Sequence, residues 1–174
     1  MSEMVYLNGG FVAKDQAKIS PDDRGFLFAD GVYEVIKYYF GSSFRFKDHL
    51  SRLKRSLGEL RIDFDGIREL EYICSELVSR NNLDQKHAGV YIQITRGANK
   101  RVHFFPKGVA PTIYAFASEL FSAEENLENG IKLITHEDIR WHRCDIKSVS
   151  LLPNTMMFNK AVEAGAGSHG CLQK

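Results

Sequence analysis

Residues 32–39, with the sequence VYEVIKYY, predict the strand around which the N-terminal part of the chain is arranged. Side chains of a strand alternate between its two faces. The expected faces are Tyr33, Val35 and Lys37 on one side, and Glu34, Ile36 and Tyr38 on the other. A turn at Phe40–Ser43 leads from this strand to Phe44–Phe46, which predicts a hairpin.

Short apolar runs on both sides of this strand predict further strands. Val5–Leu7 and Phe11–Val12 flank Asn8-Gly9-Gly10, and an Asn-Gly turn between apolar runs is a strong hairpin signal. His87–Arg96 alternates between apolar and polar residues, so it is expected to form a strand. Thr112–Ala117 is expected to form another.

Two amphipathic helices are expected between these strands. In Lys47–Arg61 four leucines recur at helical spacing and predict one buried stripe, and Arg52 lies off that stripe. Ile67–Arg80 carries a second apolar stripe and ends at two asparagines. The glycine-punctuated segment Phe26–Gly31 is expected to be a loop.

The chain is expected to contain two domains joined by a connector. Residues 119–129 are charged and only weakly patterned, as is typical of connectors. The expected N-terminal domain is 1–118, and the expected second domain is 130–174. Helices and strands are grouped rather than strictly alternating, which favours the α+β class over a doubly wound sheet.

The second domain is expected to be begun and not finished. Ile131–Ile134 predicts the start of a new sheet, to which the segment around Lys147 is also assigned. A helix is expected from Pro153 to Gly165, and residues 165–174 show neither a strand nor a helix pattern. A strand pair and one helix are too little to close a sheet and bury both of its faces.

The composition limits the kinds of partner and compartment. Among 174 residues, 23 Lys and Arg nearly cancel 22 Asp and Glu, so no overall field attracts nucleic acid or an anionic membrane. No long apolar stretch or basic-then-apolar leader is present, which indicates a cytoplasmic protein. Cys74, Cys144 and Cys171 are odd in number and widely spaced, which fits a reducing compartment.

Lys147 is the leading candidate for a catalytic residue. Arginines and aspartates surround it between Asp138 and Leu152, together with Trp141, the only tryptophan of the chain. A lysine amine becomes a nucleophile for carbonyl groups when burial or neighbouring cations keep part of it unprotonated. Lys147 is therefore a candidate Schiff-base lysine, and the alternative is an ordinary solvated lysine on a strand.

Two further features are suited to binding anions. Arg52 lies off the buried stripe of its helix, where its planar guanidinium has the geometry to grip a phosphate. Arg101 and His103 place two donors in one loop, where they are suited to a carboxylate. For each feature, taken alone, a solvated surface role remains the alternative.

Other chemistries have weaker support in the sequence. Cys144 as a nucleophile requires a histidine in fixed geometry, for which nearby His142 alone is insufficient. The spacing of His136, Glu137, Asp138 and His142 fits no metal-binding motif, so no metal site is expected. The chain also lacks the glycine motifs of dinucleotide-binding folds, P-loop NTPases and α/β-hydrolases.

Five ordered motifs run collinearly between Tyr6 and Gly165. They are Asp23-Arg24-Gly25 with Phe28–Glu34, His49–Leu53, Thr95-Arg96-Gly97, Asp138–Trp141 and Cys144–Ser148. Together they resemble the fold-type IV pyridoxal-phosphate enzymes, which include branched-chain and D-amino acid aminotransferases and aminodeoxychorismate lyases. Arg101-x-His103 is similar to the pattern of the D-amino acid aminotransferases. The resemblance implies a small N-terminal α/β sandwich-type domain followed by a β-rich pseudo-barrel domain.

The resemblance also implies a cofactor, pyridoxal 5'-phosphate, and a reaction. Lys147 is implied to form the Schiff base and to move the substrate proton, and Arg52 to hold the phosphate. Tyr33 is implied to bind the substrate carboxylate, with Arg101 and His103 supplied by the neighbouring subunit of a homodimer. The implied reaction is ping-pong transamination between a D-amino acid of the D-alanine type and a 2-oxo acid such as 2-oxoglutarate.

The chain departs from this family at its C-terminal end. The acid that pairs with the cofactor's pyridine nitrogen and the later phosphate-binding loops have no counterpart in these 174 residues. Two expectations follow: the chain is a fragment of the enzyme, or it is a truncated product with no activity of its own. Three alternatives to a D-amino acid aminotransferase stay open: a branched-chain L-amino acid aminotransferase, an aminodeoxychorismate lyase, and a self-associating domain without catalysis.

Overall fold

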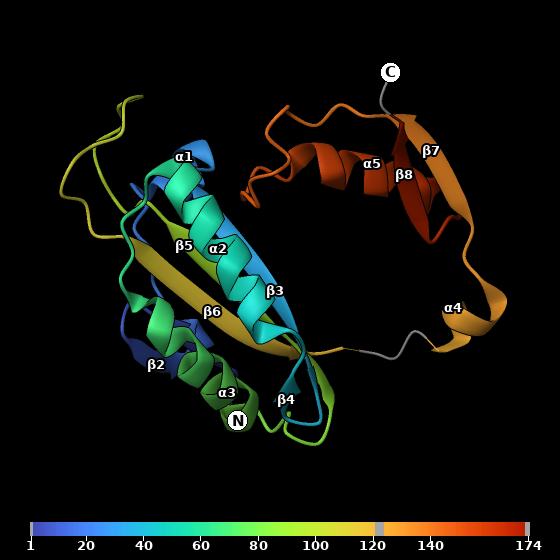
Figure 1. Ribbon diagram of the computed structural model, residues 1–174, viewed down its shortest axis with the longest axis horizontal. Helices are drawn as coiled ribbons and strands as arrows, with labels where there is room; N and C mark the ends of the chain where they lie inside the picture. The colour runs from blue at the N-terminus through green and yellow to red at the C-terminus, as the bar shows by residue number, and fades with distance from the viewer. Residues whose placement is uncertain (1, 121–123, 173–174) are drawn as a thin grey trace. The chain divides into compact units, whose positions relative to one another are not determined.

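A six-stranded antiparallel sheet organises the first of two units into which the chain divides (Figure 1). The structure is a computed structural model that describes residues 2–120 and 124–172. Unit 1 extends to Leu120 and adds the segment Asp145–Val149. Unit 2 consists of Phe121–Cys144 and Ser150–Lys174.

The sheet of unit 1 has the strand order β2-β1-β6-β5-β3-β4. The elements of unit 1 are β1 (Met4–Leu7), β2 (Gly10–Ala13), the 3-10 turn η1 (Lys14–Gln16), α1 (Arg24–Phe28), β3 (Gly31–Tyr39), β4 (Ser42–Ser43), α2 (Phe46–Leu60), the 3-10 turn η2 (Gly66–Glu69), α3 (Leu70–Arg80), β5 (His87–Thr95) and β6 (Thr112–Glu119). The predicted hairpin around Asn8-Gly9-Gly10 is confirmed as β1 and β2, and the predicted strands β5 and β6 are confirmed with it. The α+β class is thus confirmed.

Strand β3 pairs with β5 along its whole length, from Gly31 opposite Thr95 to Tyr39 opposite His87. Every second side chain of β3 is buried, and these are Val32, Glu34, Ile36 and Tyr38. The predicted alternation of residues 32–39 is therefore confirmed. It places a carboxylate, Glu34, on the side of the sheet that faces the hydrophobic core.

Helices α2 and α3 cover one face of this sheet, as Figure 1 shows. Leu53 and Leu57 of α2 are buried, and Leu50 and Leu60 pack partly buried against the same core. The buried stripe of α3 consists of Leu70, Ile73, Cys74, Leu77 and Val78. Both helix predictions are confirmed, because the apolar stripe read from the sequence is the side that each helix buries.

The segment Phe26–Gly31 is not a loop throughout, because Arg24–Phe28 forms the short helix α1. Asp23 caps this helix, since its Oδ1 accepts a hydrogen bond of 2.8 Å from Gly25 N. The helix ends at Ala29, whose φ of 54° is left-handed. The glycines of this segment led to the prediction of a loop, whereas the cap formed by Asp23 allows a short helix to begin at Arg24.

The hairpin predicted between β3 and Phe44–Phe46 is shorter than expected. Strand β4 consists of Ser42–Ser43 alone, and Phe46 already begins α2. Arg45 has a left-handed φ of 53°, which no strand residue adopts. The strand prediction for Phe44–Phe46 is therefore wrong, and the apolar character of Phe46 reflects burial at the start of α2.

Unit 2 contains a two-stranded parallel sheet and the helix that packs on it. Its elements are α4 (Glu124–Asn129), β7 (Leu133–Glu137), α5 (Leu152–Glu163) and β8 (Ser168–Leu172). The predicted helix from Pro153 to Gly165 is confirmed as α5, whereas the absence of structure expected for residues 165–174 is wrong because β8 lies there. Residues 121–123 of the predicted connector, and residues 173–174, lie outside the described residues.

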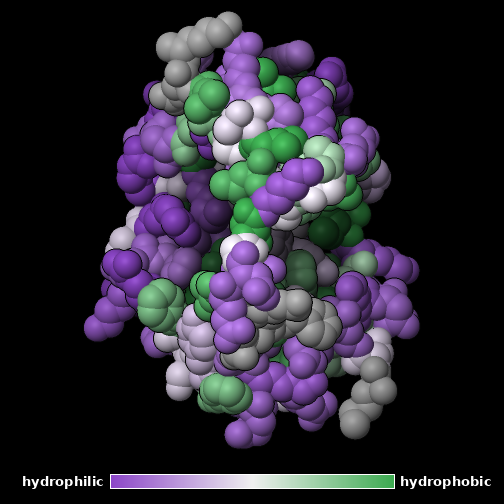
Figure 2. Space-filling view, turned by 90° about the vertical axis from the view of Figure 1, so that its right-hand side faces the viewer, coloured by the Kyte–Doolittle hydropathy of each residue, from purple (hydrophilic) through white to green (hydrophobic). Residues whose placement is uncertain are grey.

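Helix α5 of unit 2 is only partly buried. Met157 and Ala161 are its buried residues. The large apolar side chains of α5 that remain exposed are Leu152, Met156, Phe158 and Val162. Figure 2 shows hydrophobic surface alternating with hydrophilic surface on the face turned to the viewer.

Of the helices in the described ranges, none has the length and apolar character needed to cross a membrane.

Candidate active site

Lys147 lies on a segment that pairs with the start of β3. Tyr33 N donates a hydrogen bond of 3.0 Å to Lys147 O, and Val149 N donates one of 3.1 Å to Gly31 O. The main chain of Lys147 is therefore fixed beside Tyr33. The assignment of this segment to the sheet begun by residues 131–134 is wrong, because its partner is a strand more than a hundred residues earlier in the chain, which no local pattern indicates.

Helix α2 holds the same segment from its other side. Lys147 N donates to Ser56 Oγ at 3.2 Å. One residue earlier on the helix, Arg55 donates to Asp145 O at 2.7 Å and to Asp145 Oδ2 at 2.6 Å. Ile146, between these two anchors, is buried in the core of unit 1. The position of the lysine along the segment is thus determined by a strand, a helix and one core residue.

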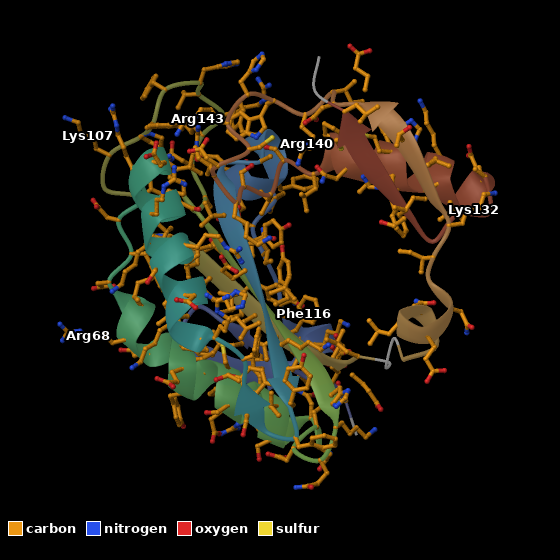
Figure 3. All side chains as sticks on the ribbon, turned by 45° about the vertical axis from the view of Figure 1, so that its right-hand side comes forward. Arg68, Lys107, Phe116, Lys132, Arg140 and Arg143 are labelled. Carbon is orange, nitrogen blue, oxygen red and sulfur yellow. The ribbon has the colours of Figure 1, made fainter. Side chains whose placement is uncertain are left out.

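The side chain of Lys147 lies over an aromatic row on the face of the sheet away from α2 and α3. Its Nζ is 4.0 Å from the centroid of the Tyr33 ring. Tyr33 stacks on Tyr91 with the ring centroids 5.6 Å apart, and Tyr91 stacks on Phe116 at 5.2 Å. Figure 3 labels Phe116 where it projects from β6 at the far end of this row.

The middle ring of this row is neutral at physiological pH. Burial raises the pKa of Tyr91 to about 12, and nearby Tyr33 and Tyr114 add to the shift. The protonated hydroxyl of Tyr91 donates to Gln93 Oε1 at 2.7 Å. This hydrogen bond fixes the middle ring of the row, on which Tyr33 stacks beneath the lysine amine.

Arg52 is oriented by a buried carboxylate. Arg52 Nε and Nη2 each donate to one oxygen of Glu34 at 2.6 Å. His49 Nδ1 lies 2.8 Å from Glu34 Oε2, so one carboxylate holds two side chains of α2. The Glu34 side chain is 1% exposed, and an unpaired charge at such a depth is costly. The pairing explains why strand β3 tolerates an acid on its core side.

Arg52 nevertheless keeps an edge in contact with water. Its side chain is 48% exposed, in contrast with its carboxylate partner. The hydrogen bond to Glu34 raises the pKa of Arg52, and the negative charge of Glu34 acts in the same direction against the effect of burial. Tyr33 also contributes to this shift, which puts Arg52 within electrostatic range of the ring under Lys147. The arrangement is a permanently charged guanidinium with its exposed edge ready for an anion.

Arg101 and His103 lie in the long loop between β5 and β6, and they gather around one phenylalanine. The His103 ring packs edge-on against Phe28, with the ring centroids 5.5 Å apart. Arg101 Cζ lies 5.0 Å from the centroid of the same ring. Among the described residues, no contact joins this pair to Lys147, Tyr33 or Arg52. Unit 1 thus brings the five predicted residues together in two separate groups.

A cavity of about 590 Å³ opens on the same face of the sheet as the aromatic row. It is lined by Ile19, Ser20, Pro21, Asp23, Gly25, Phe26, Gln93, Thr95, Thr112, Tyr114 and Val149. Val149 is two residues from Lys147 in the chain, but the lysine does not line this space. The cavity is therefore separate from the candidate residues Lys147 and Arg52, neither of which lines it.

Sequence reasoning missed the residues that hold the predicted ones. Glu34 orients Arg52, and Ser56 and Arg55 fix the segment of Lys147. One signal was present, because the alternation of residues 32–39 placed the carboxylate of Glu34 on the same face as Ile36 and Tyr38, and a carboxylate on an apolar face needs a cation. For Ser56 and Arg55 the sequence carried no comparable signal, since both lie on α2 far from the segment that they bind.

A comparison with protein families shows the family to which the chain belongs. The family described as amino-transferase class IV matches residues 31–169, from the first residue of β3 into β8. The chain belongs to the class IV aminotransferases. The matched range contains β3 with Tyr33 and Glu34, helix α2 with Arg52, and the segment of Lys147.

Individual class IV aminotransferases support this assignment. The chain is 44% identical over 165 residues to the D-alanine aminotransferase of Staphylococcus haemolyticus, covering 94% of this chain and 58% of that protein. The fold is similar to that of the branched-chain amino acid aminotransferase of Escherichia coli, with a TM-score of 0.86 at 21% identity over 99% of this chain and 60% of that one. A Mycobacterium tuberculosis protein, described as a hypothetical aminotransferase in PLP-bound form, has a TM-score of 0.81 at 19% identity, covering 98% of this chain and 62% of that chain.

The chain spans about three fifths of the length of these class IV aminotransferases. The shared region includes both groups of candidate residues, because β3, α2 and the loop between β5 and β6 all lie within the aligned part. Unit 1 of this class IV aminotransferase contains a primary amine, that of Lys147, above the ring of Tyr33. It also contains the guanidinium of Arg52, which is hydrogen-bonded to the buried carboxylate of Glu34. Such a donor set suits a small molecule that carries both a carbonyl group and a phosphate.

Proposed function

We propose that the protein catalyses pyridoxal-phosphate-dependent transamination between a D-amino acid of the D-alanine type and a 2-oxo acid such as 2-oxoglutarate. The observation that carries this proposal is the position of Lys147 Nζ, 4.0 Å from the Tyr33 ring centroid. The segment of this lysine is hydrogen-bonded to both β3 and α2. The D-alanine aminotransferase of Staphylococcus haemolyticus, at 44% identity, supports the choice of substrate.

The residues present fit the proposed cofactor in two respects. Lys147 supplies a primary amine for the aldehyde of pyridoxal phosphate, and Arg52 supplies a guanidinium for its phosphate. The cofactor, when bound, supplies the electron sink that stabilises negative charge at the substrate Cα. Lys147 Nζ would accept the proton released from that Cα and would donate it again when the product forms. Glu34 keeps Arg52 in one orientation throughout, so the phosphate is gripped by a preformed group.

The second group of residues is proposed to bind the substrate carboxylate. Arg101 and His103 are exposed and adjacent to one another on Phe28, and they have no described contact with Lys147. We therefore assign them to the site of a neighbouring subunit in a homodimer, where Tyr33 of that subunit's own site completes the carboxylate contacts.

A reducing compartment such as the cytoplasm suits Cys74, Cys144 and Cys171, which form no disulfide.

The function is tested by fixing the cofactor to the protein. The protein is incubated with pyridoxal phosphate and reduced with borohydride, and peptide mass spectrometry then locates the added mass. A single adduct on Lys147 is expected, because its amine is held beside an aromatic floor. An adduct spread over several surface lysines, or none at all, would contradict the proposal and favour the self-associating domain without catalysis.

Substitutions of Arg101 and His103 test the choice of D-amino acids. Arg101→Ala and His103→Ala are each expected to raise KM for D-alanine about 10- to 100-fold, the range for losing a hydrogen bond to a charged group. Steady-state kinetics with D-alanine and with L-leucine provide the measurement, and exposed Arg45→Ala is the control. Unchanged KM for D-alanine in both variants, together with turnover of L-leucine, would favour the branched-chain alternative.

A further inference from the structure

A buried carboxylate holds two arginines at the base of the loop that carries Arg101 and His103. Asp30 Oδ2 accepts hydrogen bonds from Arg24 Nε at 2.8 Å and from Arg96 Nε at 2.7 Å. Arg96 Nη2 adds a bond of 3.0 Å to the other oxygen. All three side chains are almost completely buried, so both guanidinium groups depend on protein partners rather than on water.

Arg96 uses its remaining donors to fasten this cluster to helix α2. Its Nη1 donates to Arg61 O at 2.9 Å, and its Nη2 donates to Leu60 O at 2.6 Å. These carbonyl groups lie at the C-terminal end of α2, where the helix dipole favours a cation. The cluster is therefore part of the rigid body of unit 1.

Arg24 uses its remaining donor differently, because it reaches the middle of the loop. Its Nη1 donates to Val102 O at 2.6 Å, and Val102 is the residue between Arg101 and His103. Within residues 2–120, we find no other hydrogen bond to the main chain of Lys100–Val109. The guanidinium of Arg24 thus connects the buried Asp30 to the main chain between Arg101 and His103.

Aromatic contacts support the same stretch of the loop. Arg96 Cζ lies 3.7 Å from the ring centroid of Phe105. Arg24 Cζ lies 4.6 Å from the centroid of the Phe28 ring, and the same ring contacts Arg101 and His103. The two functional side chains of the loop therefore rest on a surface that Asp30 and its arginines hold in place.

We propose that Arg24 is a positioning residue, which fixes the backbone between Arg101 and His103 so that both side chains are presented together to a small carboxylate. Arg24 acts through Val102 and does not touch the ligand. The inference deepens the proposed function and rests on it for the identity of that carboxylate. Because the loop is ordered when the protein folds, binding does not have to supply the free energy of ordering it.

Arg24→Lys is the variant that separates the two tasks of this arginine. An ammonium group keeps the positive charge next to Asp30, but its single nitrogen cannot also reach Val102. Trypsin is a suitable probe, because the loop contains its cleavage sites Lys100, Arg101 and Lys107, of which Figure 3 shows Lys107 projecting outwards. Cleavage after Arg101 in the 174-residue chain is expected to be about tenfold faster than in the parent, as for the loss of one charge-assisted hydrogen bond.

Two controls and one replacement variant keep the result specific. Cleavage after Lys54 on α2 reports global unfolding, and it is expected to stay unchanged. Arg45→Lys alters an exposed pair with Asp48, so it is expected to leave cleavage in the loop unchanged. If Arg24→Lys does not fold, the double variant Arg24→Met/Asp30→Asn removes one charge of each sign and is used instead. Loop cleavage within twofold of the parent in the folded variant would overturn the proposal.

Kinetics of the cofactor-loaded protein then test the presentation of the two side chains. Arg24→Lys is expected to raise KM for D-alanine about tenfold, with kcat and the borohydride-fixed adduct on Lys147 unchanged. A loosened loop with an unchanged KM would contradict the positioning role. Absence of the Lys147 adduct in the parent would instead contradict the proposed function, while the trypsin result would still decide whether Arg24 braces the loop.

Discussion

Formation of a 2-oxo acid from D-alanine is expected to fall about 10⁴-fold when Lys147 is replaced by alanine, the upper range for losing a positioned acid–base group. The reason is local, because Lys147→Ala removes the amine above Tyr33 and leaves the surrounding scaffold in place. The hydrogen bonds of residue 147 to Ser56 and Tyr33 use backbone atoms, which alanine retains. The measurement is the rate of oxo acid formation by the cofactor-loaded protein.

A matched lysine provides the control for this experiment. Lys54→Ala on the exposed side of α2 is expected to leave the rate unchanged. The thermal unfolding midpoint of Lys147→Ala is expected to match that of the parent, since no backbone anchor is lost. A Lys147→Ala protein that retained more than a tenth of the activity would show that another group performs the proton transfer.

Replacement of Asp30 by alanine is expected to destabilise the fold by about 3–5 kcal/mol, the range for removing one partner of a buried ion pair. Asp30→Ala leaves the buried guanidinium groups of Arg24 and Arg96 without their shared carboxylate. Neither side chain can turn into water, because each is also hydrogen-bonded to backbone carbonyl groups. Urea unfolding, with the midpoint and the slope fitted together, measures the loss.

An exposed aspartate distinguishes this effect from a general loss of negative charge. Asp48 pairs with Arg45 in a position where both side chains are mostly in water, so Asp48→Ala is expected to leave the urea midpoint almost unchanged. The charge-balanced variant Arg24→Met/Asp30→Asn is expected to recover part of the loss. Equal midpoints for Asp30→Ala and Asp48→Ala would mean that the buried cluster contributes no net stability.

The sequence was sufficient for elements whose signal is periodic and local. The leucines of α2, the apolar stripe of α3 and the alternation of β3 each repeat along a single element, so burial could be inferred from spacing alone. Helix α1 was missed because its five residues are too few to display a period, and its start depends on the side chain of Asp23. Strand β8 was missed because Ser168–Leu172 contains a glycine and lacks apolar alternation.

The individual candidate residues could be named from the sequence, but not their supports. Lys147 was conspicuous because of its charged neighbours, yet the strand to which it is bound lies more than a hundred residues earlier. The cluster of Asp30, Arg24 and Arg96 likewise joins side chains from two distant parts of the chain. Pairings of this kind arise from the tertiary fold, and a single sequence contains no periodic trace of them.

Asp30 immediately before β3, and Tyr33 and Glu34 within it, point to different sides of the sheet. Asp30 and Glu34 point towards the core, where each holds arginine, while Tyr33 points to the other face beneath Lys147. A shift of β3 by one residue against β5 would exchange the two faces. It would separate Glu34 from Arg52 and bury Tyr33 in the same event. The two halves of the proposed site are therefore linked by strand register, so a single inserted or deleted residue in Gly31–Tyr39 would be more damaging than the loss of either side chain.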